Sequence, residues 1–239
     1  MSIRVTVWNE FIHEREMEEA RRNYPEGIHG AIAGFLSGEP DLEVTTAVLG
    51  DPEQGLPDAL LDVTDVLIWW GHTAHRQVDD ALVEKIVARV YDGMGMVFLH
   101  SAHHSKPFRR LCGTGCDLKW WVDGDRERLF TLLPGHPIAA GLPEYFELPA
   151  EETYCELFDI PTPDEVVFSG WFSGGAVFRS GCCFHYGRGR YFYFQPGHET
   201  YPTYHDENVR RVIKNAVRWA APAAGPKPTF GHFEPFEAR

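Results

Sequence analysis

The fold is decided by residues 66–100, which read VLIWWGHTAHRQVDDALVEKIVARVYDGMGMVFLH. Residues 66–70 form a continuous apolar run, which is typical of a strand buried on both faces of a parallel sheet. Residues 79–91 carry apolar side chains at helical spacing, and residues 96–99 form a second apolar strand. This order predicts an α/β fold with a doubly wound, mostly parallel sheet and helices on both faces. In such sheets, ligands bind at the carboxyl ends of the strands.

The same alternation continues outward from this unit in both directions. We expect further strands at residues 3–8, 42–48, 165–168, 176–185 and 190–195. We expect further helices at residues 10–22, 28–36 and 208–220.

Two segments depart from the alternation. Residues 107–164 are irregular and rich in proline, and they predict short helices and a lid or hairpin. Residues 222–239 are rich in proline and glycine and lack apolar periodicity. We therefore divide the chain into one α/β domain, residues 1–221, and a C-terminal tail, residues 222–239, that packs along the surface or on a partner subunit.

Bulk properties restrict the partners and the compartment of the chain. Its 239 residues include 35 acidic and 22 basic ones, and the formal net charge of -13 argues against nucleic acid as a partner. The first residues lack the features of a signal peptide, and no apolar run approaches the roughly 20 residues of a membrane span. The five cysteines form an odd set without CxxC spacing, which fits a reducing compartment. We expect a cytoplasmic protein that binds no membrane.

Histidines follow the predicted strands where those strands end. His100 ends the strand at residues 96–99 just before a helix, which is the place of a nucleophile elbow in α/β folds. Ser101 is the alternative elbow residue, but it lacks the flanking glycines of a G-x-S-x-G motif. His198 and Glu199 follow the last strand, and a His-acid pair there can act as a general base or bind a metal. We assign His100, His198 and Glu199 as catalytic, with Glu199 orienting His198.

Further side chains are expected to line the same crevice and to bind the substrate. In the loop after residues 66–70, His72 is favoured over His75, which can face solvent just before the next helix. In the loop after residues 96–99, His103 and His104 cannot easily both face one pocket, so one is structural, and His104 is favoured for the pocket. Tryptophans at strand ends can stack on sugar rings, although they more often fill the core. The substrate-binding candidates are Glu26, His29, Trp70, His72, Ser101, His104 and Cys182.

A divalent metal such as zinc is the one cofactor that these residues suggest, and no nucleotide cofactor is evident. Neutral imidazoles with a carboxylate bind zinc, and an open coordination position can polarise a sugar carbonyl or hydroxyl. The ligands expected are His100 and His198 with His72 or His29. Glu26 or Glu152 could supply the carboxylate.

Several long motifs resemble those of the ThuA-like, or trehalose utilization, family. They are Trp69-Trp70-Gly71-His72, residues 24–30 and residues 178–183, and the similarity runs from Trp8-Asn9-Glu10 to residues 219–222. The resemblance implies a flavodoxin-like fold similar to class I glutamine amidotransferases, in which a cysteine and a distant histidine form the catalytic pair. Here His100 stands at the cysteine position, and Gly197-His198-Glu199 replaces a His-Pro-Glu pattern. Ammonia release from glutamine is therefore not expected.

The resemblance also implies a role in the breakdown of trehalose and related disaccharides, beside oxidoreductases thought to make 3-keto sugars. We expect an enzyme, a sugar isomerase or hydrolase, that acts by acid/base or metal-assisted chemistry on a keto sugar. With the Pro-rich tail, the resemblance favours a homo-oligomer. The alternative is a non-catalytic sugar-binding or regulatory protein that lacks the nucleophilic cysteine. A glutaminase or peptidase that recruits Ser101 or Cys182 is a third hypothesis.

Overall fold

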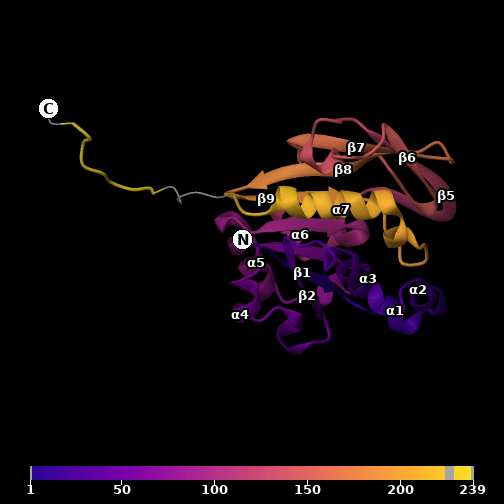
Figure 1. The fold of residues 1–239 in the computed structure, drawn as a ribbon, viewed down its shortest axis with the longest axis horizontal. Helices are drawn as coiled ribbons and strands as arrows, with labels where there is room; N and C mark the ends of the chain where they lie inside the picture. The colour runs from indigo at the N-terminus through magenta and orange to yellow at the C-terminus, as the bar shows by residue number, and fades with distance from the viewer. Residues whose placement is uncertain (1, 224–228, 238–239) are drawn as a thin grey trace.

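The computed structural model describes residues 2–223 and 229–237, and these contain one large mixed sheet with helices on both faces. The strands lie in the order β2-β1-β3-β4-β9-β8-β7-β5-β6 (Figure 1). Their bounds are β1 Ile3–Asn9, β2 Leu42–Val48, β3 Val66–Trp70, β4 Gly95–Leu99, β5 Lys119–Thr131, β6 Tyr145–Cys155, β7 Glu165–Phe172, β8 Val177–Tyr186 and β9 Gly189–Phe194.

The sheet has a parallel part and an antiparallel part that meet at β9. Strands β2, β1, β3, β4 and β9 run parallel, whereas β9, β8, β7, β5 and β6 pair antiparallel. The doubly wound α/β fold predicted from the sequence is therefore confirmed for the parallel part. The irregular segment contains a long β5–β6 hairpin, which extends the same sheet.

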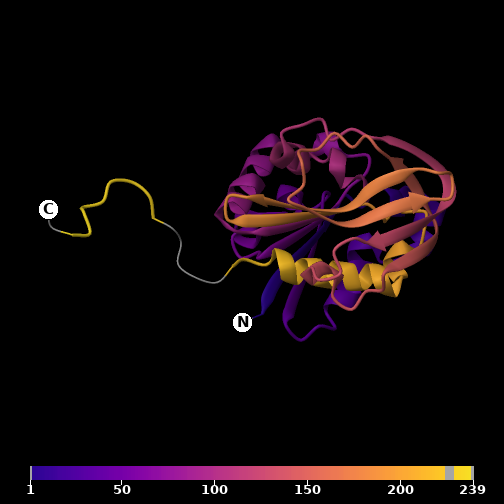
Figure 2. The same ribbon diagram turned by 90° about the horizontal axis from the view of Figure 1, so that it is seen from above.

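Helices cover the two faces of the sheet and bury two separate apolar cores. On one face α3 (Gly27–Leu36) and α7 (Glu207–Ala220) pack over β1, β4 and β9. On the other face, α5 (Asp80–Asp92) and α6 (Lys106–Cys112) pack against the opposite side of the same strands. Figures 1 and 2 show α7, in yellow, running along one side of the strands.

Short helices occupy the loops between these elements. They are α1 His13–Glu16, α2 Glu18–Asn23 and α4 Asp58–Leu61, with 3-10 turns at Pro52–Gly55, His75–Gln77, His100–His104, Pro137–Ala139 and Thr203–His205. The single helix expected at residues 10–22 is thus two short helices, α1 and α2, with Met17 extended between them. The turns at His75–Gln77, His100–His104 and Thr203–His205 lie beside the carboxyl ends of the parallel strands.

The C-terminal tail forms no helix or strand in residues 222, 223 and 229–237. Phe230 and Phe236 in it are exposed. The rest of the tail, residues 224–228 and 238–239, lies outside the described residues, and packing of the tail on a partner subunit stays a prediction. None of the helices in the described ranges is both long enough and apolar enough to cross a membrane.

Candidate active site with a histidine-carboxylate cluster

His100 occupies a left-handed backbone position directly after β4. Its φ of 54° is one that a non-glycine residue adopts at a local cost, and such positions are characteristic of elbows at active sites. The ring is fully buried, and Nδ1 donates a hydrogen bond to the carbonyl oxygen of Gln195 at 3.0 Å. The Tyr193 hydroxyl donates to the His100 carbonyl at 2.9 Å, which fixes the turn from the other side. The remaining ring nitrogen, Nε2, therefore points inward with no backbone partner.

His198 is held by a buried carboxylate that lies beneath its loop. The two oxygens of Glu151 accept hydrogen bonds from the backbone N–H groups of Gly197 and His198 at 2.9 and 3.1 Å. Gly197 has a φ of 136°, and a Cβ there would overlap the Tyr204 hydroxyl, so only glycine fits. The Thr200 hydroxyl lies 2.8 Å from Nδ1 of His198 and can donate or accept. The sequence assigned the orientation of His198 to Glu199, but the structure gives it to Thr200.

His72 lies on the loop after β3, and a second buried carboxylate shapes this loop. Glu10 accepts hydrogen bonds from the backbone N–H groups of Thr73 and Ala74 at 2.8 and 2.9 Å. Nδ1 of His72 donates to Oε2 of Glu199 at 3.0 Å. His72 is the most exposed ring of the site, with a quarter of its side chain accessible, so solvent and substrate approach the site from its side.

These three histidines and Glu152 of β6 converge on one point. Each of the four side chains offers one ligand atom, and these atoms all lie within 4.8 Å of one another. The ring centroids of His72, His100 and His198 are 5.4 to 5.8 Å apart. Three strand ends of the parallel part and one strand of the antiparallel hairpin therefore build a single cluster.

Two atoms in the cluster lack a hydrogen bond although they are buried. Nε2 of His100 lies 3.0 Å from Oε2 of Glu152, but the two atoms are not aligned for a hydrogen bond. Buried polar atoms without partners are costly, and such sites commonly bind an ion, a water molecule or a substrate. At His72 and His100 the Nδ1 atom is engaged by an outer acceptor, which leaves the Nε2 lone pair for a ligand. This is the usual arrangement around histidines that bind metals.

Glu199 forms a second group with His13 and His72. Its Oε1 lies 2.9 Å from Nδ1 of His13, and the ligand atoms of the three residues lie within 4.8 Å of one another. Burial opposes ionisation, but the close contact with His13 and the hydrogen bond from His72 lower the pKa of Glu199 far below its ordinary value. Glu199 is therefore a carboxylate throughout the physiological pH range, and its contact with His198 is the longer one, at 3.7 Å.

The electrostatic environment keeps one histidine neutral and favours charge on another. Burial, together with the charge of His100, lowers the pKa of His198 to about 4. Burial also opposes protonation of His100, but contact with Glu152 outweighs it and raises the pKa of His100. The cluster thus combines His198, which is a neutral imidazole near neutral pH and can accept a proton or a metal, with a second imidazole, His100, whose protonated form the Glu152 carboxylate favours.

The other residues expected in the crevice lie around the cluster. Trp70 is buried and donates from Nε1 to the Gly197 carbonyl at 3.1 Å, so it supports the loop of His198. The Ser101 hydroxyl donates to the Gly71 carbonyl at 2.8 Å. His29 contacts Asn9 at 3.1 Å, which sets it apart from the four clustered side chains. These three residues belong to the frame of the site.

Three further candidates do not join the cluster. Glu26 is exposed at the start of α3, and Cys182 is buried in the apolar core of the α5–α6 face. His104 pairs with Asp117 at 3.1 Å and turns away from the cluster. His103 is buried against Tyr154, which leaves it a structural role.

Sequence reasoning missed His13 and Glu151. His13 lies in the charged segment 10–22, where no pattern separates it from its neighbours, and its partner Glu199 is far away along the chain. Glu151 adjoins Glu152 in the irregular segment. The two adjacent glutamates were a visible signal in the sequence. Successive side chains of a strand point to opposite faces of the sheet, so one of the two is expected to face the interior.

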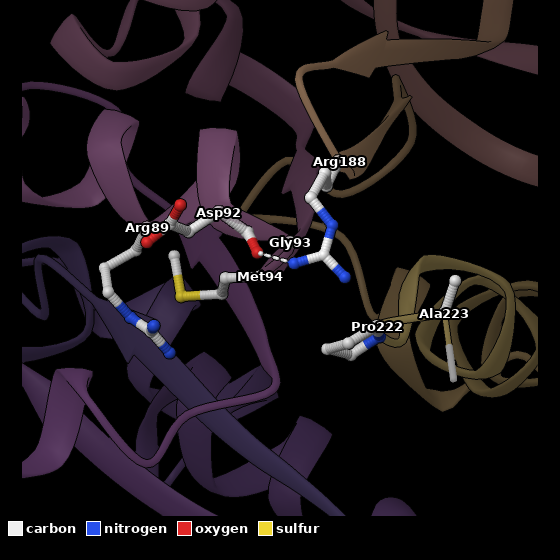
Figure 3. Close-up of a pocket in the computed structure, with 7 residues that line it drawn as sticks. All are labelled: Arg89, Asp92, Gly93, Met94, Arg188, Pro222 and Ala223. Atoms are coloured by element: carbon white, nitrogen blue, oxygen red, sulfur yellow. Dashed lines mark hydrogen bonds between the residues drawn. The ribbon is translucent and has the colours of Figure 1, made fainter. Parts of the chain in front are cut away.

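A cavity of about 450 Å³ lies elsewhere, at the end of α5 and the start of β4. Figure 3 shows Arg89, Met94 and Arg188 around it, with the Arg188 side chain donating to the Asp92 carbonyl. This cavity lies at the amino ends of the parallel strands and contains none of the clustered histidines. The candidate catalytic residues lie at the carboxyl ends of the strands and not in this cavity.

Known proteins share both the sequence family and the fold of this chain. A family model described as ThuA, trehalose utilisation, matches residues 4–220. No curated protein matches the chain. A crystal structure of a protein described as ThuA-like, from Parabacteroides merdae, is 15% identical with a TM-score of 0.69 and covers 95% of this chain and 94% of its own.

Two other solved structures share the fold at lower similarity. The cytoplasmic protein STM1381 from Salmonella typhimurium is 12% identical with a TM-score of 0.61, and the match covers 92% of this chain and all of that one. A chain of PurLQS from Thermotoga maritima is 12% identical with a TM-score of 0.51, over 92% of this chain and 99% of that one. The fold is thus the flavodoxin-like one of class I glutamine amidotransferases, with His100 at the elbow. The chain belongs to the ThuA family of trehalose utilisation.

Proposed function

We propose that this protein is an enzyme of trehalose and disaccharide utilisation that isomerises or hydrolytically cleaves an oxidised, 3-keto sugar. The observation that carries the proposal is the convergence of His72, His100, His198 and Glu152 at the carboxyl ends of the parallel strands. Membership of the trehalose utilisation family supports the substrate class. A histidine at the elbow, where a thiol would be needed, argues against glutamine hydrolysis.

We further propose that the cluster binds a divalent metal such as zinc. Three imidazole nitrogens and one carboxylate oxygen are a donor set that zinc accepts. The orphaned Nε2 of His100 and Oε2 of Glu152 would both gain a partner. A metal bound there supplies Lewis-acid polarisation of a sugar carbonyl or hydroxyl.

The protein's own residues would orient the ligands, transfer protons and exclude water. Glu199 and Gln195 fix the rings of His72 and His100 through their Nδ1 atoms. Glu199 with His13 provides a carboxylate–histidine pair beside the cluster that can hold or move a proton. Burial of the cluster excludes bulk water from three of its four side chains.

The setting of the enzyme follows from the same reasoning. We place it in the cytoplasm, because the Salmonella protein of similar fold is described as cytoplasmic. A 3-keto sugar requires prior oxidation of a hydroxyl, so we propose a functional link to sugar oxidoreductases. We also propose that the protein acts as a homo-oligomer.

A proton NMR time course with 3-keto-trehalose tests the proposal. Wild type is compared with His100→Ala, with a chelator-treated sample, and with His185→Ala as a control. His185 is an exposed histidine that pairs with Asp164, far from the cluster. New sugar signals that vanish in His100→Ala but persist in His185→Ala support the enzyme.

Loss of turnover after chelation, restored by zinc, supports the metal, whereas full turnover after chelation refutes it. Broadening of the sugar signals without conversion would overturn the enzyme in favour of a sugar-binding protein.

A further inference from the structure

A second cavity of about 420 Å³ lies beside the histidine cluster and is built from the same loops. The loop after β3 contributes Thr73, His75 and Arg76, and the turn and helix after β4 contribute His104, Lys106 and Arg109. Asp117 completes the lining. His72 and His100 thus face the cluster, while His75 and His104 on the same two loops face this cavity.

The cavity concentrates positive charge in a strongly acidic protein. Within the described residues, no carboxylate pairs with the guanidinium of Arg76 or Arg109. Asp117 is engaged by His104 at 3.1 Å, and Lys106 is paired with Asp80 at 2.7 Å on the outer rim. In the described part of the chain, two arginines of the lining thus form no ion pair of their own, although the chain as a whole carries a net charge of -13.

His75 adds an unused hydrogen-bonding atom. Its Nε2 is buried without a partner, and its ring lies 6.3 Å from that of His104. Burial, followed by the charge of His104, lowers the pKa of His75 to about 3. An anion in the cavity would give the neutral His75 ring a hydrogen-bond partner at Nε2 and would offset the repulsion between the guanidinium groups of Arg76 and Arg109.

The cavity is within reach of a ligand that also contacts the cluster. Thr73, in its lining, follows His72 directly, and His72 is the side chain through which the cluster is exposed. Because His72 and Thr73 are neighbours in the chain, a substituent on a sugar ring that faces His72 can enter the cavity.

We propose that this cavity binds an oxyanion, a phosphate or carboxylate group carried by the sugar that enters the neighbouring site. Arg76 and Arg109 contact the oxyanion, since guanidinium groups bind both kinds of anion in bidentate geometry. The class of substrate is then an acidic or phosphorylated keto sugar. This inference rests on the proposed function for the identity of the sugar, but the anion site can be tested without turnover.

Isothermal titration calorimetry of the full chain with inorganic phosphate is the first experiment. The double variant Arg76→Gln/Arg109→Gln is expected to bind phosphate at least roughly tenfold more weakly than wild type, because two charge-assisted contacts are lost. Arg110→Gln is the matched control, since Arg110 is next on the same helix but is exposed and pairs with Glu84. Equal loss in the control, or unchanged binding in the double variant, would overturn the proposal.

Glucuronate, glucose 6-phosphate and glucose distinguish the sources of the anion. Tighter binding of glucuronate than of glucose 6-phosphate assigns a carboxylate, and the reverse order assigns a phosphate. Binding of glucose that equals both would contradict an anion site. Phosphate binding that depends on both arginines, in a protein that does not convert 3-keto-trehalose, would retain the anion site while rejecting that sugar as the substrate.

Discussion

Nδ1 of His72 donates to Oε2 of Glu199 at 3.0 Å, across a span of chain from the loop after β3 to the loop after β9. This contact fixes the ring of His72 and directs its other nitrogen toward His100 and His198. It also makes Nε2 of His72 a more basic ligand atom, because the ionised carboxylate accepts the hydrogen bond that Nδ1–H donates. Glu199 therefore acts on the cluster through His72.

Glu199→Gln is expected to weaken zinc binding by about 10- to 100-fold, because an amide holds the His72 proton less strongly than a carboxylate does. Calorimetric titration of the chelated protein with zinc measures the change. Glu18→Gln, which alters an exposed residue of α2, should bind zinc as wild type does. Equal affinities of Glu199→Gln and wild type would show that Glu199 does not support a metal ligand.

Zinc itself is expected to stabilise the fold. At a free concentration 100-fold above its Kd it adds about 2.7 kcal/mol to the free energy of unfolding. For a chain of this size, that corresponds to a rise in Tm of about 5–10 °C, which differential scanning calorimetry would detect. His100→Ala should abolish the rise and His185→Ala should retain it. A Tm that is the same with zinc and with chelator in wild type would contradict the metal site.

Glu127→Gln is expected to stabilise the protein at high pH. Glu127 is fully buried on β5, and burial, with repulsion from Glu151, raises the pKa of Glu127 well above its ordinary value. The folded state therefore binds this proton more tightly than the unfolded state, so wild type loses stability as pH rises from the ordinary carboxyl range toward the folded pKa.

Urea unfolding should show the variant more stable by about 1–3 kcal/mol at pH 8, with the difference shrinking toward pH 4. Glu144→Gln, an exposed substitution, should show no such pH dependence. A difference between Glu127→Gln and wild type that stays constant with pH would mean that the carboxyl proton is not the cause.

Gly197→Ala is expected to destabilise the fold by about 1–3 kcal/mol and to displace His198, because the φ of 136° and the Tyr204 hydroxyl exclude a side chain. Gly34→Ala is the contrasting substitution. Gly34 lies exposed in α3 with open space around it, so alanine there should add about 0.5–1 kcal/mol. Urea unfolding of both variants measures these changes, and a neutral Gly197→Ala would show that the loop can relax.

The parallel part of the sheet and three of the four clustered side chains were predictable from the sequence. Residues 66–70 and 96–99 are apolar throughout because both faces of β3 and β4 are buried. A polar residue that follows such a run therefore stands out in the sequence. His72, His100 and His198 each follow such a strand. Their convergence follows from the parallel arrangement, since parallel strands end at one edge of the sheet.

Glu152 was predicted only as one of two carboxylates, and Glu151 and His13 were not predicted at all. Strand β5, which pairs with β6, has most of its side chains at least partly exposed and contains irregularities near Asp125. Strand β6 alternates only in its first half, and residues 151–154 are all buried, so no local pattern shows which of them reaches the histidines. The contact of His13 with Glu199 depends on tertiary structure in the same way.

The order of the clustered residues along the chain has a consequence for biosynthesis. His72 and His100 are made early, Glu152 later, and His198 only after the last strand of the sheet. A nascent chain therefore contains two of the clustered histidines early, but it has all four clustered residues only when nearly the whole domain has left the ribosome. With the cluster as the proposed zinc site, the complete set of four donors therefore forms only when the polypeptide can fold.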